Sequence, residues 1–282
     1  MERVIRRGHR ATQGSTWAAC YPLRILDRMT KHREFLPREL AEALESFHAE
    51  GFCVVTGVLS NAQCAALQGI LVETQSRADR GEGEERWFAD ETAWQFDASL
   101  RRIVRKVPKP FDTHPVFREI FSSDPVLDLV EAFVGPQIYI HSSKMLYKPA
   151  RVGLAKPMHQ DLAYWQDMLA QQVTLWCAID AVTADNGCME LVPGAHRKGL
   201  RPHVQLEDWQ IDPVDVPERP LVVEMAAGDV LFLHPLVPHA SRPNRSDGGR
   251  LAAIVNYYSE PSLPGCGASY GSETPLRCRA QN

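Results

Sequence analysis

The sequence predicts a mainly β fold flanked by α-helices. Helical patterns occupy the first half of the chain, short strand-like runs follow Gly135, and Gly, Pro and Asn residues separate those runs. Helices followed by many short strands are typical of a β-sandwich or barrel that amino-terminal helices wrap. Because 282 residues, 44% of them hydrophobic, can bury one sizeable core, we predict a single domain over residues 36–282.

Residues 1–35 are predicted to form a loosely attached amino-terminal extension. Between Arg3 and Arg28 the first acidic residue is Asp27, a composition that mitochondrial targeting segments share. The sequence has no apolar run of the roughly 20 residues that span a bilayer, and its start lacks the apolar core of a secretory signal. We therefore predict a cytoplasmic protein without a membrane partner, with mitochondrial targeting as the lesser alternative.

The composition argues against several classes of protein. Seven cysteines are scattered along the chain without a C-x-x-C pair, which disfavours a disulfide framework and a zinc knuckle. The net charge of -4 gives no broad basic surface, so no nucleic-acid partner is predicted. The basic run at residues 101–109 would suit an anionic group, but such runs are more often a solvated face.

Three helical regions precede the strands. The first covers residues 36–51, where hydrophobic residues are spaced by four and three and a glycine closes the pattern. A short strand at 52–56 follows, and Ser60 is expected as the N-cap of a second helix. Between residues 115 and 134, two helices are predicted, with a break near Asp124.

The core strands are predicted between about residue 137 and residue 260. Each is a short run rich in residues that favour strands, and turn residues bound it on both sides. The predicted strands cover residues 137–146, 173–179, 188–192, 221–225, 230–233 and 251–258. The loops at 79–96 and 200–220 are expected to gate entry of a substrate.

The clearest chemical signal is the pair His159 and Asp161. Positions i and i+2 of an extended strand point to the same face, so this imidazole and carboxylate can reach one metal ion. A mononuclear iron oxygenase needs a second histidine and leaves three coordination positions open. His239, in a turn of small residues, is the predicted third ligand, whereas His234 ends an apolar run and suits a core histidine.

Arg250 is the predicted anchor for 2-oxoglutarate. The ketoacid end of this co-substrate would chelate iron, while its distal carboxylate needs a permanently charged, bidentate partner. Arg250 opens a strand-like run eleven residues after His239, so an antiparallel return would bring its guanidinium alongside that histidine. The Ser241 hydroxyl is a second donor for the same carboxylate.

Five motifs in order resemble the phytanoyl-CoA dioxygenase family, which includes ectoine hydroxylase. They are F-x-x-x-G-F-x-V-V-x-G-V-L (47–59), IYIHSSKMLYKP (138–149), HQDLAYW (159–165), DNGCMELVPGAHRKG (185–199) and GDVLFLHPLVPHASRPN (228–244). The resemblance implies a double-stranded β-helix (jelly roll, cupin-like) core, with DNGCMELVPGAH as a strand, turn and strand. The dipeptide Asn186-Gly187 is itself a hairpin signal.

The family pattern also implies roles for single residues. It makes His159, Asp161 and His239 the iron ligands and pairs Arg250 with Ser241 on the distal carboxylate. It places Gln160 and Trp176 beside the co-substrate and Trp165 at the mouth of the site, and it treats His196 as structural. The equivalents of Ser142 and Leu146 in ectoine hydroxylase are amides that contact the co-substrate. Because Leu146 cannot do this, Ser142 is expected to rebuild that network.

The resemblance implies an enzyme that uses Fe(II), 2-oxoglutarate and O2, with ascorbate in a supporting role. It would hydroxylate an unactivated C–H bond of a small metabolite, for instance in natural-product biosynthesis, and release succinate and CO2. Asp161 disfavours halogenation, because halogenating relatives have a small residue there. Desaturation, epimerisation and ring closure stay open, as do a non-catalytic cupin-like binding protein and a zinc hydrolase. The substrate and the oligomeric state are not predicted.

Overall fold

A computed structural model describes residues 3–5, 37–83, 87, 103–151, 153–165, 171–206, 208–216, 218–259 and 274–279. The helices are α1 (Pro37–Glu50), α2 (Asn61–Asp79), α3 (Pro110–Thr113), α4 (Pro115–Phe121) and α5 (Asp124–Val134). The early strands are β1 (Arg3–Ile5), β2 (Phe52–Val55), β3 (Lys106–Pro108), β4 (Gln137–Lys148), β5 (Lys156–His159), β6 (Gln172–Ala178) and β7 (Met189–Leu191). The later strands are β8 (His203–Gln205), β9 (Trp209–Ile211), β10 (Leu221–Val223), β11 (Val230–Leu233), β12 (His239–Ser241), β13 (Arg250–Tyr258) and β14 (Arg277–Cys278).

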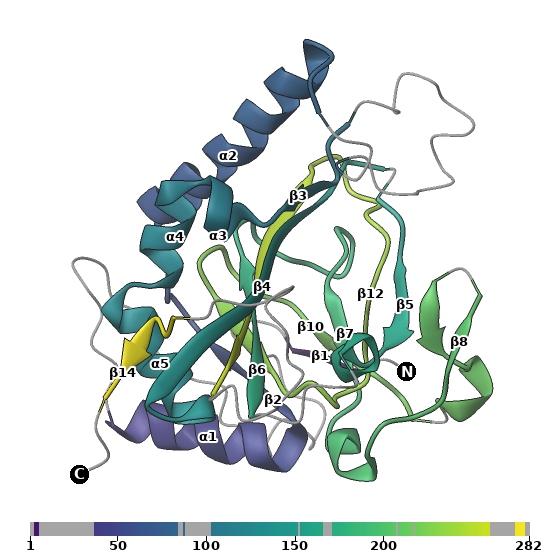
Figure 1. The fold of residues 1–282 in the computed structure, drawn as a ribbon. Coiled ribbons are helices and arrows are strands. Elements are labelled where there is room, and N and C mark those ends of the chain that lie inside the picture. Colours follow the sequence, from purple (N-terminus) through teal and green to yellow (C-terminus); the bar gives the residue numbers. More distant parts are fainter. Residues whose placement is uncertain are drawn as a thin grey trace, which may run out of the picture.

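Two sheets build the β core. The larger sheet has the order β14-β4-β13-β6-β11-β2, and β3 also pairs with β4. The smaller sheet has the order β1-β10-β7-β12-β5. Helices α1, α2, α4 and α5 gather on one side of the larger sheet, and β5, β7 and β12 lie on its other side (Figure 1). The chain is therefore a sandwich with helices on one flank, as the sequence predicts.

Alternation along the strands of the larger sheet separates two cores. On β6, Leu175 and Cys177 belong to a hydrophobic cluster shared with the helices, whereas Trp176 and Ala178 belong to a cluster shared with β7 and β10. Successive side chains of a strand point to opposite faces, so each strand contributes to both clusters. Thr174 lies on the same face as Trp176 and therefore points between the two sheets, where the candidate site is found.

Local signals placed the helices accurately. Ser60 is the N-cap of α2 and forms a capping box with Gln63, in which each residue accepts a hydrogen bond from the backbone of the other. The break between α4 and α5 falls at Ser122 and Ser123, just before Asp124 and Pro125. Proline is favoured in the first helical turn, which explains why the second helix begins there.

Seven of the described strands lie outside the strand ranges predicted from the sequence, namely β1, β3, β5, β8, β9, β12 and β14. His239, which was expected in a turn, begins β12. Strand β3 lies within the basic run and pairs with β4, while β8 and β9 form a hairpin inside the predicted loop at 200–220. Of the predicted extension, the structure describes only β1, which pairs in parallel with β10. Most of the predicted gating loop at 79–96 lies outside the described residues.

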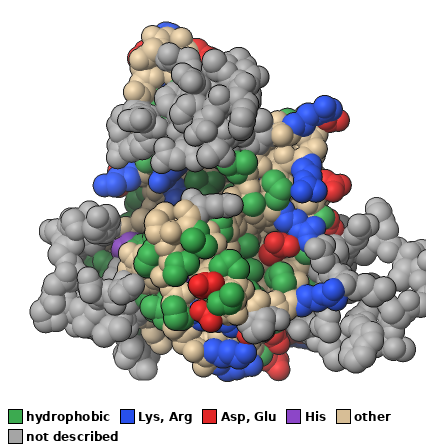
Figure 2. All heavy atoms as spheres, turned by 90° about the vertical axis from the view of Figure 1, so that its right-hand side faces the viewer, with side chains coloured by type: hydrophobic (Ala, Val, Ile, Leu, Met, Phe, Trp, Pro, Cys, Tyr) green, Lys and Arg blue, Asp and Glu red, His purple; other side chains and the backbone are tan. Residues whose placement is uncertain are grey.

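The side of the molecule that bears β5 and β8 has a mixed surface. Figure 2 shows hydrophobic side chains gathered near its centre, with lysine and arginine side chains around them. None of the helices in the described ranges is both long and apolar enough to cross a membrane.

The fold should lose stability in mild acid because of two histidines, His141, which is buried, and His234, which is partly buried. Burial lowers the pKa of His141 and that of His234 to about 4. An unfolded histidine has a pKa near 6.5, so between pH 6.5 and 4 the unfolded chain binds more protons than the folded one. Stability should therefore fall as pH drops through that window, by on the order of 1–3 kcal/mol for His141 and by less for the partly exposed His234.

This pH dependence can be assigned to one histidine by urea unfolding of metal-free protein at pH 7 and pH 5. His234→Gln should lose less stability between the two pH values than wild type does. Parallel losses in the two proteins would show that carboxylates or other groups, and not His234, cause the acid sensitivity.

Candidate metal centre

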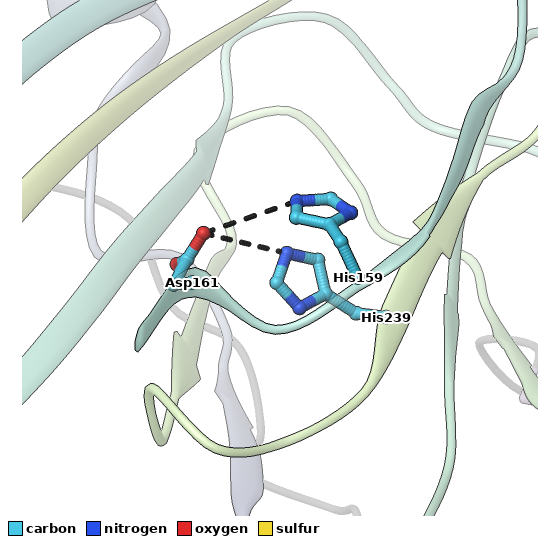
Figure 3. A group of neighbouring side chains, drawn as sticks. All are labelled: His159, Asp161 and His239. Atoms are coloured by element: carbon cyan, nitrogen blue, oxygen red, sulfur yellow. Dashed lines mark ion pairs between the residues drawn. The ribbon is translucent and has the colours of Figure 1, made fainter. Parts of the chain in front are cut away.

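His159, Asp161 and His239 lie together at the ends of two paired strands. His159 ends β5 and stands directly opposite His239, which begins β12. Asp161 opens a short 3-10 helix, η4 (Asp161–Tyr164). One carboxylate oxygen of Asp161, Oδ1, lies 3.9 Å from Nε2 of His159 and 3.7 Å from Nε2 of His239 (Figure 3). All three side chains are buried, and their ligand atoms lie within 4.8 Å of one another.

Backbone carbonyls orient both imidazoles for metal binding. Nδ1 of His159 lies 2.8 Å from the carbonyl oxygen of Pro157, and Nδ1 of His239 lies 3.0 Å from that of Val237. An imidazole that donates from Nδ1 keeps the Nε2 lone pair for a metal. Burial, and then the nearby His239 and Lys156, hold the pKa of His159 well below its ordinary value, which favours the neutral, ligating form.

A chain of three hydrogen bonds holds the other oxygen of Asp161. The hydroxyl of Thr174 donates to Oδ2 of Asp161 at 2.7 Å, and Nδ2 of Asn256 donates to the Thr174 hydroxyl at 2.7 Å. The hydroxyl of Ser142 in turn donates to Oδ1 of Asn256 at 2.7 Å. We name Ser142, Asn256 and Thr174 the carboxylate relay. Because the relay occupies Oδ2, Oδ1 is left facing the two histidines.

Arg250 is a buried cation that forms no ion pair with any residue the structure describes. Arg250 is 2% exposed, and among the described residues it makes one hydrogen bond, from Nη2 to the carbonyl oxygen of Gly187 at 2.8 Å. The Nε atom has no hydrogen-bond partner in the part of the chain that the structure describes. Burial lowers the pKa of Arg250 to about 10, so it stays charged at neutral pH. Such a group is costly unless a ligand supplies the missing negative charge.

The surroundings of Arg250 are shaped to admit its guanidinium. Gly187 has a φ of +99°, and a Cβ there would lie 2.8 Å from the Arg242 carbonyl oxygen and 3.4 Å from Nη2 of Arg250. The ring of Trp176 lies 5.3 Å from the guanidinium carbon, a cation–π distance. Ser241 is buried on β12, but no hydrogen bond joins it to Arg250 among the described residues.

The route by which Arg250 reaches this region differs from the prediction. β12 pairs with β5 and β7, whereas β13 pairs with β4 and β6. The expected antiparallel return of Arg250 alongside His239 was therefore wrong, because the two strands belong to opposite sheets. Arg250 instead reaches across the sandwich to the turn before β7.

The segment DNGCMELVPGAH also differs from its prediction. Only β7 is a strand, and after it the chain forms a turn and a 3-10 helix, η5 (Ala195–Lys198). Asn186 and Gly187 connect β6 to β7, which lie in different sheets, so their turn closes no hairpin. The prediction of strand, turn and strand was wrong because Pro193 and Gly194 end the run after one strand.

The side chain of Gln160 hydrogen-bonds to the backbone of two loops. Its Nε2 donates to the carbonyl oxygens of Gly199 and Leu236, and its Oε1 accepts from the backbone N–H of Arg201. These bonds use both amide donors, and the side chain has no exposed surface. The role beside the co-substrate therefore stays a prediction, and this bonding does not favour it.

The remaining predicted residues surround the site at different depths. Trp176 lies inside the sandwich against Arg250, and Ser142 uses its hydroxyl on Asn256. Trp165 follows η4 and packs against His141, with ring centroids 4.8 Å apart. His196 and His234 pack against each other at 5.1 Å and do not join the metal cluster.

Two nitrogens and one carboxylate oxygen are the donor set of mononuclear non-haem iron oxygenases. The donor set, the fixed orientation of both imidazoles and the unpaired buried arginine fit iron together with a ligand that carries a distal carboxylate. The residues that sequence reasoning missed are Thr174 and Asn256. Their signal was their place on the inward face of β6 and β13, two and six residues from Trp176 and Arg250.

Comparison with known proteins agrees with this fit. The profile of the family described as Phytanoyl-CoA dioxygenase (PhyH) matches residues 47–252. A probable phytanoyl-CoA dioxygenase of Caenorhabditis elegans is 30% identical over 56% of this chain and 55% of its own length. A probable alpha-ketoglutarate-dependent hypophosphite dioxygenase of Stutzerimonas stutzeri is 27% identical over 67% of this chain and 70% of its own. The chain spans about half the length of the phytanoyl-CoA dioxygenases it matches.

Solved structures confirm the predicted jelly-roll fold. EctD from S. alaskensis, crystallised with 2-oxoglutarate and 5-hydroxyectoine, superposes with a TM-score of 0.66 at 19% identity, over 89% of this chain and 90% of its own. The alpha-ketoglutarate-dependent carbocyclase SnoK from nogalamycin biosynthesis superposes with a TM-score of 0.61 at 26% identity, over 77% of this chain and 83% of its own.

These matches and the His–Asp–His site confirm iron and 2-oxoglutarate as the cofactors. The matched range of the family profile includes His159, Asp161 and His239 and extends past Arg250. The chain therefore belongs to the phytanoyl-CoA dioxygenase family.

Proposed function

We propose that this protein is an Fe(II)- and 2-oxoglutarate-dependent dioxygenase that hydroxylates an unactivated C–H bond of a small metabolite. The observation that carries the proposal is the pairing of a His–Asp–His cluster with a buried arginine that has no anionic partner among the described residues. A metal cluster alone would also serve a hydrolase or a binding protein. The buried positive charge of Arg250 would be stabilised by a bound carboxylate, and 2-oxoglutarate carries one.

Each residue has a stated task in this proposal. His159, Asp161 and His239 hold the metal, and the carbonyls of Pro157 and Val237 fix the imidazoles in the orientation that binds it. Arg250, with Ser241, holds the distal carboxylate of 2-oxoglutarate, and Trp176 covers the guanidinium and keeps water from it. When bound, iron with 2-oxoglutarate and O2 supplies the oxidation of a C–H bond, with succinate and CO2 as products.

The prime substrate is proposed at the mouth of the site, beside Trp165. Relatives are named for phytanoyl-CoA, hypophosphite and methylphosphonate, so the family accommodates both long and very small substrates. We propose a small metabolite handled in the cytoplasm, with Gln160 and Ser142 as weaker candidates for contact with the co-substrate. The basic run and the hairpin of β8 and β9 are further places where a substrate can be selected.

A second outcome with the same cofactors is a ring-forming oxidation. The likeness to the carbocyclase SnoK favours it, because that structure is 26% identical over most of this chain. Epimerisation and desaturation need the same metal site and differ in how the substrate is held. A zinc hydrolase leaves Arg250 without a task, and a binding protein without turnover has no need for both Arg250 and the three metal ligands.

The proposal is tested by measuring the binding of Fe(II) and 2-oxoglutarate under anaerobic conditions. Purified protein receives Fe(II) and then 2-oxoglutarate, and the weak visible charge-transfer band of the chelate is recorded. A band in wild type supports the proposal and justifies a search for substrates by succinate release. Bound Fe(II) without a band on addition of 2-oxoglutarate would refute the proposal and favour another metal chemistry or a binding role.

A further inference from the structure

Lys144 lies on the inward face of the larger sheet, close to the metal ligands. On β4 it stands opposite Ile254 of β13, and Ile254 stands opposite Trp176 of β6. Ile254 and Trp176 both belong to the cluster between the two sheets, so the side chain of Lys144 points into the same space. Ser142, which begins the carboxylate relay, precedes it by two residues on that face.

The ammonium of Lys144 has no hydrogen bond or ion pair with any part of the chain that the structure describes. The charged groups that face it are Asp161, Lys106, Lys156 and Asp208. Both acids are already engaged, since Asp161 accepts from Thr174 and Asp208 pairs with Lys156. Burial, more than the two neighbouring lysines, lowers the pKa of Lys144. A largely buried ammonium without a partner is unfavourable, and an anion bound beside it would offset that cost.

Lys144 is separate from the arginine assigned to the co-substrate. Arg250 stands opposite Lys148, four residues along the strands from the pair Lys144 and Ile254. At about 3.3 Å per residue, the backbones of these two positions are about 13 Å apart. Lys148 is itself engaged by the carbonyl oxygens of Leu154 and Ser241. The inward face therefore carries two cations, Arg250 and Lys144, that are available to anions at two depths.

We propose that Lys144 binds an oxyanion group of the prime substrate, a carboxylate or a phosphonate or phosphate, and so places a neighbouring C–H bond beside the metal ligands. This inference rests on the proposed function and names its substrate class. An ammonium at this place would select small anionic substrates over neutral ones of the same shape. It would also explain why β4 carries a charged residue in a row that Ile254 and Trp176 otherwise make apolar.

The experiment compares wild type with Lys144→Met, Lys144→Arg and Lys198→Met. Lys198 is a matched control, because it is exposed and pairs with Glu218, and its replacement removes the same charge. Each protein is loaded anaerobically with Fe(II) and 2-oxoglutarate and titrated calorimetrically with methylphosphonate, acetate and neutral acetamide. Thermal melting verifies that each variant is folded.

Wild type should bind at least one of the two anions more tightly than acetamide. Lys144→Met should weaken anion binding roughly tenfold or more, Lys144→Arg should retain most of it, and Lys198→Met should match wild type. A preference for methylphosphonate would indicate a phosphorus oxyanion, and a preference for acetate would indicate a carboxylate. The affinity for 2-oxoglutarate should stay the same in all four proteins.

Three results would overturn the inference. Wild type that binds neither anion better than acetamide has no such site. Equal anion binding in wild type and Lys144→Met places the site elsewhere. A loss of 2-oxoglutarate affinity in Lys144→Met assigns the lysine to the co-substrate. Failure of the proposed function itself appears separately, as the absence of the 2-oxoglutarate band in wild type.

Discussion

Replacing Arg250 with methionine should weaken 2-oxoglutarate binding by roughly 100-fold or more, since two charge-assisted hydrogen bonds to one carboxylate are lost. The stability of the protein without ligand should change little. Arg250 is 2% exposed, its Nε has no hydrogen-bond partner among the described residues, and no described carboxylate forms an ion pair with it. Apolar side chains of similar volume often replace such buried charges without loss of stability. A residue kept for stability would show the opposite pattern.

Anaerobic titration of the Fe(II) protein with 2-oxoglutarate measures the affinity, and thermal melting without ligand measures the stability. Arg250→Lys keeps the charge but not the planar pair of donors, so its affinity for 2-oxoglutarate should lie between that of wild type and that of Arg250→Met. Arg38→Met is the control, because Arg38 is exposed on α1 and its loss removes the same charge. Unchanged affinity in Arg250→Met would assign the distal carboxylate to another residue, and Lys148 would be the first to test.

The cluster of His159, Asp161 and His239 that could hold a metal was found from the sequence, because the signal of its first two members is local. A histidine and an aspartate two residues apart share a face wherever the backbone is extended, and Gln160 between them is extended. The apolar runs that became β6, β11 and β13 were equally visible, because both of their faces are buried and the runs are continuous. The capping box at Ser60 is likewise contained within four residues.

What could not be predicted depends on pairing between distant segments. The residues around β12 and β13 do not indicate that these strands belong to different sheets. The predicted pairing of the Arg250 strand with the His239 strand was therefore wrong, although Arg250 itself was identified as a candidate site residue. Gln160 was predicted to lie beside the co-substrate because of its place in the motif. Its hydrogen bonds are made to loops about 40 and 76 residues further along the chain. Thr174 and Asn256 are polar residues within apolar strands, and only the register of β6 against β13 shows that they meet.

The carboxylate relay leads to the second prediction: Thr174→Val should weaken Fe(II) binding by roughly 10- to 100-fold, as is usual when a partner of a metal ligand is removed. Valine keeps the branched shape of threonine but has no hydroxyl. Asp161 then loses the donor on Oδ2, and Asn256 loses the acceptor for its Nδ2. The carboxylate is free to rotate, so Oδ1 is no longer held toward His159 and His239.

The chain offers a closely matched control in Thr74. Thr74 and Thr174 are both 3% exposed, but the hydroxyl of Thr74 donates to the carbonyl oxygen of Ile70 within α2. Thr74→Val should leave Fe(II) affinity unchanged, and Thr174→Ser, which keeps the hydroxyl, should restore most of it. Competition with a chelator under anaerobic conditions measures the Fe(II) affinity of Thr174→Val, Thr174→Ser and Thr74→Val. Equal metal affinity in Thr174→Val and wild type would show that the two histidines and the backbone of η4 suffice to hold Asp161.

The relay also predicts an order among its members. Ser142 is the far end, and its hydroxyl reaches Asp161 only through Asn256 and Thr174. All three hydrogen bonds run in the same direction, so each strengthens the next, and the effect of a deletion should fade with distance from the carboxylate. Ser142→Ala should therefore weaken Fe(II) binding less than Thr174→Val. If Ser142→Ala instead lowers 2-oxoglutarate affinity and spares Fe(II) affinity, its hydroxyl serves the co-substrate, as the resemblance to ectoine hydroxylase implies.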